Sequence, residues 1–155
     1  CNDCGFINYV NPKVVVGAVA VWEERILLCQ RSIEPCAGSW TLPAGYLENG
    51  ETTEAGALRE AREEANATLE LDRLLGVYNI PRISQVQVIY TARLTSPDVS
   101  AGHETQDVGL YAWDEIPWGL IEFPSVHWAL NHWRDAVKTG DLLARTNPPG
   151  DNGNL

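Results

Sequence analysis

Runs of apolar residues predict β-strands along most of the chain. The longest run, residues 14–22, is rich in β-branched side chains, and two glutamates separate it from a second apolar segment at residues 26–29. This arrangement predicts a β-hairpin whose first strand is buried. Pro81, Pro97 and a loop containing Gly102 interrupt the later apolar segments. We expect further strands at residues 40–42, 69–78, 85–94 and 107–113.

Two stretches carry helical signals instead. Residues 52–65 follow a predicted loop at residues 44–51, with Thr52 suited to the N-cap. Asn66 lies where a residue in the left-handed conformation would end this helix. Residues 125–139 have apolar side chains at helical spacing and predict a second helix.

Length and composition fit one compact domain. The chain has 155 residues, 45% of them hydrophobic. Its longest apolar run is well short of the roughly 20 residues that a membrane-spanning helix needs, and no signal peptide precedes it. We therefore expect a soluble, cytoplasmic protein without a membrane partner. The absence of Met, even at position 1, suggests that the numbering starts downstream of the natural start, and residues 147–155 predict a mobile tail.

The formal net charge of −10 argues against a nucleic-acid partner, because that binding mode draws on clustered Lys and Arg. An anionic substrate would instead need a divalent cation held by carboxylates. A simpler alternative is that the acidity only keeps the protein in solution.

The cysteines suggest half of a metal site. Cys1-x-x-Cys4 has the spacing of one half of a ribbon-type zinc site, which ordinarily needs a second pair for tetrahedral coordination. Cys29 and Cys36 are typical of reduced thiols in a cytoplasmic protein. Zinc is therefore expected at Cys1 and Cys4 only if a second cysteine pair is present.

One face of the first predicted helix is strongly acidic. Glu60, Glu63 and Glu64 stand at i, i+3 and i+4, so their carboxylates project from the same side. Three like charges repel one another unless a cation or a basic neighbour intervenes. The alternative is an ordinary solvated acidic surface.

A longer pattern surrounds this acidic face. The spacing Gly-x5-Glu-x7-Arg-Glu-Ala-x-Glu-Glu is met at Gly45, Glu51, Arg59, Glu60, Ala61, Glu63 and Glu64. It resembles the Nudix box, a long and specific motif. Asn66 stands where that family usually has Gly, but Asn tolerates positive φ, so the helix is still expected to end there. Small Ala67 replaces a larger aliphatic residue.

Shorter strings resemble the zinc-ribbon-bearing Nudix hydrolases related to FAD and ADP-ribose pyrophosphatases. They lie at residues 11–13, 27–31, 40–45, 80–83 and 114–118. The resemblance implies an α/β/α sandwich around a mixed sheet. Residues 11–140 would form the hydrolase domain, 1–10 a remnant of an N-terminal zinc ribbon and 141–155 a C-terminal tail. A homodimer fits the family resemblance, although the sequence carries no direct sign of one.

The resemblance also implies an activity: magnesium-dependent cleavage of the pyrophosphate bond of a nucleoside diphosphate derivative such as ADP-ribose or FAD, releasing AMP and a phosphorylated moiety. Magnesium prefers hard oxygen ligands, and Mn²⁺ is an alternative ion. The implied metal ligands are Glu60, Glu63, Glu64 and the backbone carbonyl of Ala44.

Other residues would support this chemistry. Arg59 would orient and charge-balance the glutamates, and Glu51 would have a similar supporting role. Glu104, in the loop before a later strand, is a candidate metal ligand or general base, with a solvated loop residue as the alternative.

The small-molecule nucleotide substrate needs contacts of its own. Arg31 and Arg82 are candidate phosphate or ribose contacts, with surface ion pairs as the alternative. Tyr46 and Tyr78 are candidates for stacking on the base. Two other functions stay open: hydrolysis of noncanonical nucleoside triphosphates or dinucleoside polyphosphates, and a non-catalytic nucleotide sensor. The intact glutamates of the box disfavour the sensor.

Overall fold

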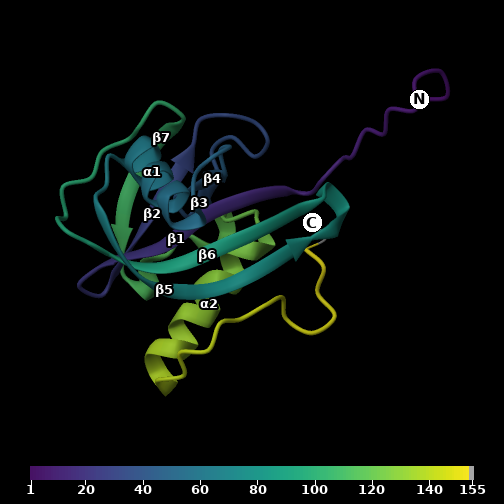
Figure 1. Cartoon of the computed structure of the whole chain (residues 1–155). Helices are drawn as coiled ribbons and strands as arrows, with labels where there is room; N and C mark the ends of the chain where they lie inside the picture. Colours follow the sequence, from purple (N-terminus) through teal and green to yellow (C-terminus); the bar gives the residue numbers. More distant parts are fainter. Residues whose placement is uncertain (154–155) are drawn as a thin grey trace.

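A mixed β-sheet with a helix on each side forms the body of the molecule (Figure 1). This computed structural model describes residues 1–153. The strands are β1 (Lys13–Trp22), β2 (Arg25–Arg31), β3 (Trp40–Thr41), β4 (Ala44–Tyr46), β5 (Leu69–Ile80), β6 (Gln85–Leu94) and β7 (Thr105–Tyr111). The helices are α1 (Thr53–Ala65) and α2 (Pro124–Thr139), and the 3-10 turns are η1 (Pro81–Ile83), η2 (Trp113–Glu115) and η3 (Trp118–Leu120). The predicted α/β/α sandwich is confirmed.

Strand β1 organises the sheet. It runs parallel to β6 along most of its length, and β6 continues antiparallel to β5. On its other edge β1 pairs with β4 near its start and with β2 at its end. Strand β2 in turn pairs with β3 and with β7. Strands β4 and β2 therefore leave β1 at different points along the same edge.

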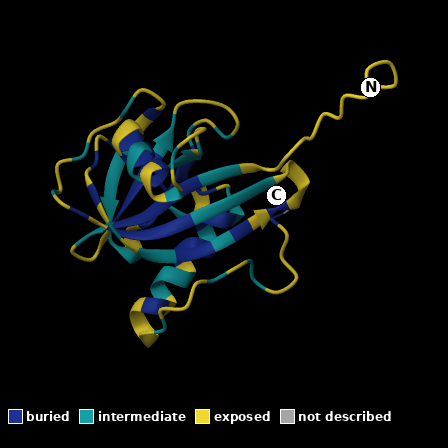
Figure 2. Cartoon of the chain, viewed as in Figure 1, coloured by how far each residue is buried: buried dark blue, intermediate teal, exposed yellow. Residues whose placement is uncertain are grey.

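Alternating side chains of β1 serve two hydrophobic cores, as the period of two in a strand requires. Ala18 and Ala20 belong to the core under α1, whereas Val19 packs in the core under α2. Both faces of the strand are buried, which explains why its sequence is an almost continuous apolar run. Figure 2 shows these central strands buried between the two helices.

The ends of α1 follow from local chemistry. The Thr52 hydroxyl accepts a hydrogen bond from the amide of Ala55 at 3.1 Å. Asn66 has φ 49° and ψ 28°, and its amide donates to the carbonyl of Arg62 at 3.0 Å. The predicted cap and the predicted left-handed end are both confirmed.

Two predicted boundaries were wrong. Part of the segment expected to be a loop forms β4, because its three residues pair with β1 from Val15 to Gly17. The strand expected at residues 107–113 is β7, which begins at Thr105 and ends at Tyr111. Trp113 instead starts the 3-10 turn η2. Both differences arise from pairing with strands distant in sequence.

The segment after α2 packs back along the outer edge of β5. Arg145 forms a parallel bridge with Gly76, and the side chain of Asn147 exchanges two hydrogen bonds of 2.8 Å with the backbone of Asn79. Asp151 accepts a hydrogen bond from the indole of Trp128 at 3.1 Å. The segment for which a mobile tail is expected from residue 147 thus packs against β5 and α2 in its described part, and residues 154–155 lie outside the described residues.

Replacing Asn147 by Ala is expected to lower the free energy of unfolding by about 1 kcal/mol, because the backbone groups of Asn79 lose both partners. Denaturant unfolding measures the difference. Asn131→Ala is the matched control, since the Asn131 amide bonds only a carbonyl within its own helix. Equal stability of the two variants would show that the tail contributes nothing at this point.

The first twelve residues leave the body of the molecule as an exposed arm (Figure 2). Cys1 and Cys4 are exposed and free, whereas Cys29 is buried in β2. Residues 1–153 contain no group of three or more Cys, His, Asp or Glu side chains arranged to hold a metal ion. The cysteine pair therefore meets no second pair here. Separately, no helix in the described part is long and apolar enough to cross a membrane.

Candidate active site

A cleft of about 530 Å³ opens beside α1. Its walls come from the end of β2, from β4 and the turn that follows it, from one face of α1 and from the loop before β7. The fold thus brings together residues from four separate segments. The predicted site residues that line the cleft are Arg31, Ala44, Tyr46, Arg59, Glu60, Glu63, Glu64 and Glu104.

Two of the helix glutamates are buried. Glu60 and Glu64 are each 8% exposed, and the Glu64 carboxylate accepts one hydrogen bond, from the amide of Ala44 at 2.9 Å. Burial raises the pKa of both carboxyl groups, that of Glu64 to about 7. The charge of Glu104 acts in the same direction on both. A solvated acidic surface would show neither the burial nor these pKa shifts, so that alternative does not describe this pair.

Arg59 joins the acidic side chains into one network. Its guanidinium binds both carboxylate oxygens of Glu51, at 2.7 and 3.1 Å. The third nitrogen, Nη1, donates to Glu60 at 2.7 Å and to Glu63 at 3.1 Å. The hydrogen bonds from Arg59 lower the pKa of Glu51, and those to Glu51 are the main reason that the pKa of Arg59 is raised. Opposite charge at close range therefore offsets part of the repulsion among the glutamates.

The donor set suits a hard divalent cation, although the glutamates are paired with Arg59 in this structure. Nη1 of Arg59 lies between the carboxylates of Glu60 and Glu63, so the carboxylates do not converge on one point. Glu64 keeps one carboxylate oxygen without a protein partner among the hydrogen bonds of the described residues. Buried carboxylates with so few donors fit a cation of the magnesium class, which takes oxygen ligands and retains water.

Gly45 lets the backbone of β4 approach these carboxylates. A Cβ atom at this position would overlap the carboxylate of Glu60. Any larger residue would displace that carboxylate, so glycine leaves Glu60 in place where the strand passes the helix. The amide of the preceding residue, Ala44, reaches Glu64 from the same strand.

Replacing Arg59 by Lys is expected to lower kcat about 10- to 100-fold, because one ammonium group cannot bind Glu51, Glu60 and Glu63 at once. Steady-state rates with each purified variant measure this. Arg62→Lys is the matched control, since Arg62 is exposed on the same helix one turn further along. If both variants keep the normal rate, the Arg59 network has no part in catalysis.

The predicted substrate contacts divide into two groups. Arg31 and Tyr46 line the cleft, and Tyr46 is 51% exposed. Tyr78 is fully buried under α2, where its hydroxyl lies 2.9 Å from Nδ1 of His132. Tyr78 therefore has no exposed surface to offer a nucleotide and does not line the cleft. Arg82 is exposed in η1 and is absent from the cleft lining.

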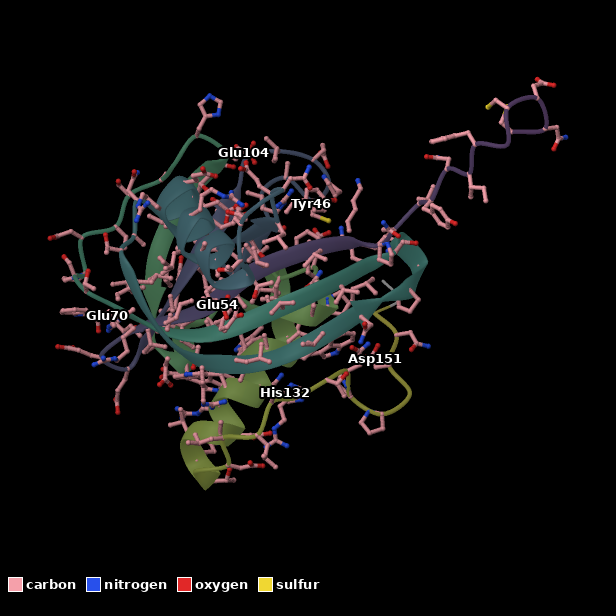
Figure 3. All side chains as sticks on the ribbon, viewed as in Figure 1. Tyr46, Glu54, Glu70, Glu104, His132 and Asp151 are labelled. Carbon is pink, nitrogen blue, oxygen red and sulfur yellow. The ribbon has the colours of Figure 1, made fainter. Side chains whose placement is uncertain are left out.

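Figure 3 shows the two sides of the sheet on which these regions lie. Tyr46 and Glu104 lie on the side of the sheet that carries α1, whereas His132 and Asp151 lie on the side that carries α2. The alternation of side chains along β5 does not indicate which face of the sheet carries the cleft. Tyr78 lies on the other face, in the core under α2.

Some residues at the cleft were not predicted from the sequence. Ile33, Glu48 and His103 also line it. A second groove of about 350 Å³ shares Tyr46, Leu47 and Glu48 with the cleft and is also lined by Lys13. Lys13 lies with its ammonium 5.0 Å from the centre of the Tyr46 ring. These residues belong to loops and strand ends, where the spacing of residues in the sequence does not predict which side chains line a cleft.

The fold and the acidic helix define a class of protein. A family model for the NUDIX domain matches residues 11–133. The chain therefore belongs to the NUDIX family and is a hydrolase of the pyrophosphatase type.

Individual relatives agree with this assignment. The crystal structure of a NUDIX hydrolase from Nitrosomonas europaea has a TM-score of 0.90 and 43% identity, covering 94% of this chain and 83% of that chain. A putative 8-oxo-dGTP diphosphatase of Bacillus subtilis is 34% identical over 129 residues, 78% of this chain and 83% of the relative. The ADP-ribose pyrophosphatase of Methanocaldococcus jannaschii is 28% identical over 113 residues, 70% of this chain and 67% of the relative.

Proposed function

We propose that the chain is a magnesium-dependent hydrolase that cleaves the pyrophosphate bond of a nucleoside diphosphate derivative. The observation that carries this proposal is the pair of buried carboxylates, Glu60 and Glu64, against the backbone of β4. Such groups are costly to bury without a compensating cation. The proposed ligands are these two side chains, Glu63 and the backbone carbonyl of Ala44. Mn²⁺ is an alternative ion.

Each residue of the site would have its own role in this reaction. A divalent ion, when bound, would neutralise charge on the diphosphate and orient a water molecule for in-line attack. Arg59 holds the glutamates in position through its hydrogen bonds, and Glu51 fixes Arg59 in turn. Glu104, at the rim of the cleft, would accept the proton of the attacking water at its carboxylate. Arg31 would bind phosphate oxygens, and Tyr46 would stack on a flat ring of the substrate.

We propose ADP-ribose or an FAD-like molecule as the substrate, with AMP and a phosphorylated moiety as products. The similarity to an archaeal ADP-ribose pyrophosphatase supports this choice. A second candidate substrate is a noncanonical nucleoside triphosphate, favoured by the similarity to a putative 8-oxo-dGTP diphosphatase. Dinucleoside polyphosphates form a third class. The cleft volume of about 530 Å³ is within the usual range for small-molecule sites.

A screen of ADP-ribose, FAD, NADH, dinucleoside polyphosphates and 8-oxo-dGTP with and without magnesium tests the proposal. Products identified by mass spectrometry separate the candidates, because ADP-ribose or FAD would yield AMP whereas a triphosphate would yield pyrophosphate. Reaction in oxygen-labelled water shows which phosphorus is attacked. Tight binding of ADP-ribose without magnesium-dependent hydrolysis would favour the nucleotide-sensor alternative and refute the proposed activity.

Membership of the zinc-ribbon-bearing subgroup is a separate proposal. It is supported by Cys1 and Cys4, which are exposed, free and spaced as half of a ribbon site. Two thiolates leave a tetrahedral zinc ion two ligands short, so zinc binding by the chain as it stands should be weak. Zinc titration with a colorimetric chelator measures it. Cys1→Ser is expected to remove whatever binding is found.

A further inference from the structure

The loop between β6 and β7 passes directly over the C-terminal end of α1. The amide of Ser100 donates to the carbonyl of Ala65 at 3.0 Å, and the amide of Gly102 donates to that of Glu64 at 2.9 Å. Carbonyls in the last turn of a helix have no partner within the helix. The loop therefore supplies hydrogen bonds that the end of α1 needs, and it is held there in return.

Asn66 adds a side-chain connection at the same place. Its Nδ2 donates to the carbonyl oxygen of Ser100 at 3.1 Å and lies 3.0 Å from the hydroxyl of the same residue. The carbonyl of Ala101 lies 3.4 Å from the same nitrogen. A glycine could end the helix with the same backbone conformation, but it could make none of these contacts.

Gly102 shows how closely the loop approaches the helix. A Cβ atom at this position would overlap the backbone carbonyl oxygen of Glu63 and would lie 3.1 Å from the carbonyl carbon of Glu64. The loop thus lies in direct contact with the turn of α1 that carries two of the proposed metal ligands. The obstructing atoms are backbone atoms, which cannot rotate away.

The same loop then carries Glu104 to the cleft. The Glu104 carbonyl accepts a hydrogen bond from the amide of Ser32 at 3.0 Å, just beyond β2. The amide of Thr105 donates to the carbonyl of Gly102 at 3.3 Å. Glu104 is therefore fixed on one side to α1 through Gly102 and on the other to the end of β2. Glu104 lines the same cleft as Glu60 and Glu64.

We propose that Asn66 is a positioning residue: its amide side chain holds the loop at Ser100 and Ala101 and so places Glu104 opposite the glutamates of α1. The inference rests on the proposed function, in which Glu104 takes a proton from the attacking water. Asn66 itself is exposed and does not line the cleft, so it would touch neither substrate nor metal. Its effect on the reaction would pass through the loop alone.

Asn66→Gly is the decisive variant, because glycine keeps the left-handed end of α1 and removes only the amide. We expect kcat to fall about five- to tenfold, the range that corresponds to losing one or two side-chain hydrogen bonds, with KM unchanged. Asn66→Asp keeps the shape of Asn but has no hydrogen to donate to the Ser100 carbonyl, although its carboxylate can accept one from the Ser100 hydroxyl. In the Ser100→Ala background, which removes that hydroxyl, Asn66→Asp should therefore fall as far as Asn66→Gly. Ser100→Ala is the matched control and should retain activity, because the Asn66 bond to the backbone carbonyl remains.

A double-mutant cycle with Glu104→Gln tests the route. If Asn66 acts through Glu104, Asn66→Gly has no further effect on kcat once Glu104 is replaced. An equal fold-loss in both backgrounds, or a normal kcat for Asn66→Gly alone, overturns the proposal.

Hydrogen exchange provides a readout that needs no substrate. The Gly102 amide should exchange faster in Asn66→Gly, while amides in the middle of α1 keep their protection. Unchanged exchange at Gly102 also overturns the proposal. A wild-type chain that hydrolyses nothing refutes the proposed function and the role of Glu104 with it, and the exchange rates then still report whether Asn66 holds the loop.

Discussion

Replacing Glu60 by Gln should lower kcat by about two to four orders of magnitude at saturating magnesium, because the amide removes a negative charge from the proposed metal ligands. The fold should survive. Gln has the same shape, its carbonyl oxygen can still accept the hydrogen bond from Arg59, and burying a neutral group is easier than burying a carboxylate. Initial rates measured against magnesium concentration, together with a thermal unfolding curve, test both parts.

Glu54→Gln is the control on the same helix. Glu54 is exposed in the first turn of α1 and lines no part of the cleft, so its replacement should leave the rate unchanged. A near-normal rate for Glu60→Gln would show that the buried carboxylates do not hold the catalytic metal. Equal losses in both variants would point instead to a general effect of charge on the helix.

The second large effect is expected at Gly45. Alanine at this position would place its Cβ against the carboxylate of Glu60, the mobile end of a side chain rather than backbone. The glutamate can move aside, so the free energy of unfolding should change by only about 1 kcal/mol or less. Its displacement from the cleft should nevertheless reduce kcat about a hundredfold, since small misplacements of catalytic groups are costly. Rates and denaturant unfolding of the same preparation separate the two effects.

Gly17→Ala is the matched substitution for Gly45→Ala. Its Cβ would meet the side chain of Ala44, on the paired strand β4, and would lie 2.6 Å from the carbonyl oxygen of Pro43, just before that strand. Backbone atoms must then shift, and we expect a loss of roughly 1–3 kcal/mol in stability. Gly45→Ala would contradict the argument if it lost stability as Gly17→Ala does while retaining its activity.

Local chemistry explains what could be predicted from the sequence. The ends of α1 depend on Thr52 and Asn66 themselves, through a hydroxyl that caps the helix and an amide residue that tolerates positive φ. To predict the acidic face, only the helical spacing of the glutamates in α1 was needed. The hairpin of β1 and β2 required only two apolar runs and a short connection. In each case the determining residues lie within a few positions of one another.

Features that depend on distant partners were missed. The three residues of β4 become a strand because β1 offers them an edge, and no pattern within β4 indicates it. Tyr78 was assigned to the substrate because its aromatic character is visible in the sequence, whereas the face of β5 that it occupies is set by packing against α2. The sequence predicted that Arg59 orients the glutamates. Which atoms it binds could not be predicted, because they depend on how α1 lies against β4.

The tail along β5 has a consequence for the partly folded chain. Asn147 meets Asn79 across a separation of 68 residues, so this edge of β5 is covered only when the end of the chain has packed against the sheet. Until then the outer edge of β5 is an unpaired strand, the type of surface on which chains associate edge to edge. The partly folded chain, more than the native protein, is therefore the state in which neighbouring molecules would pair by mistake.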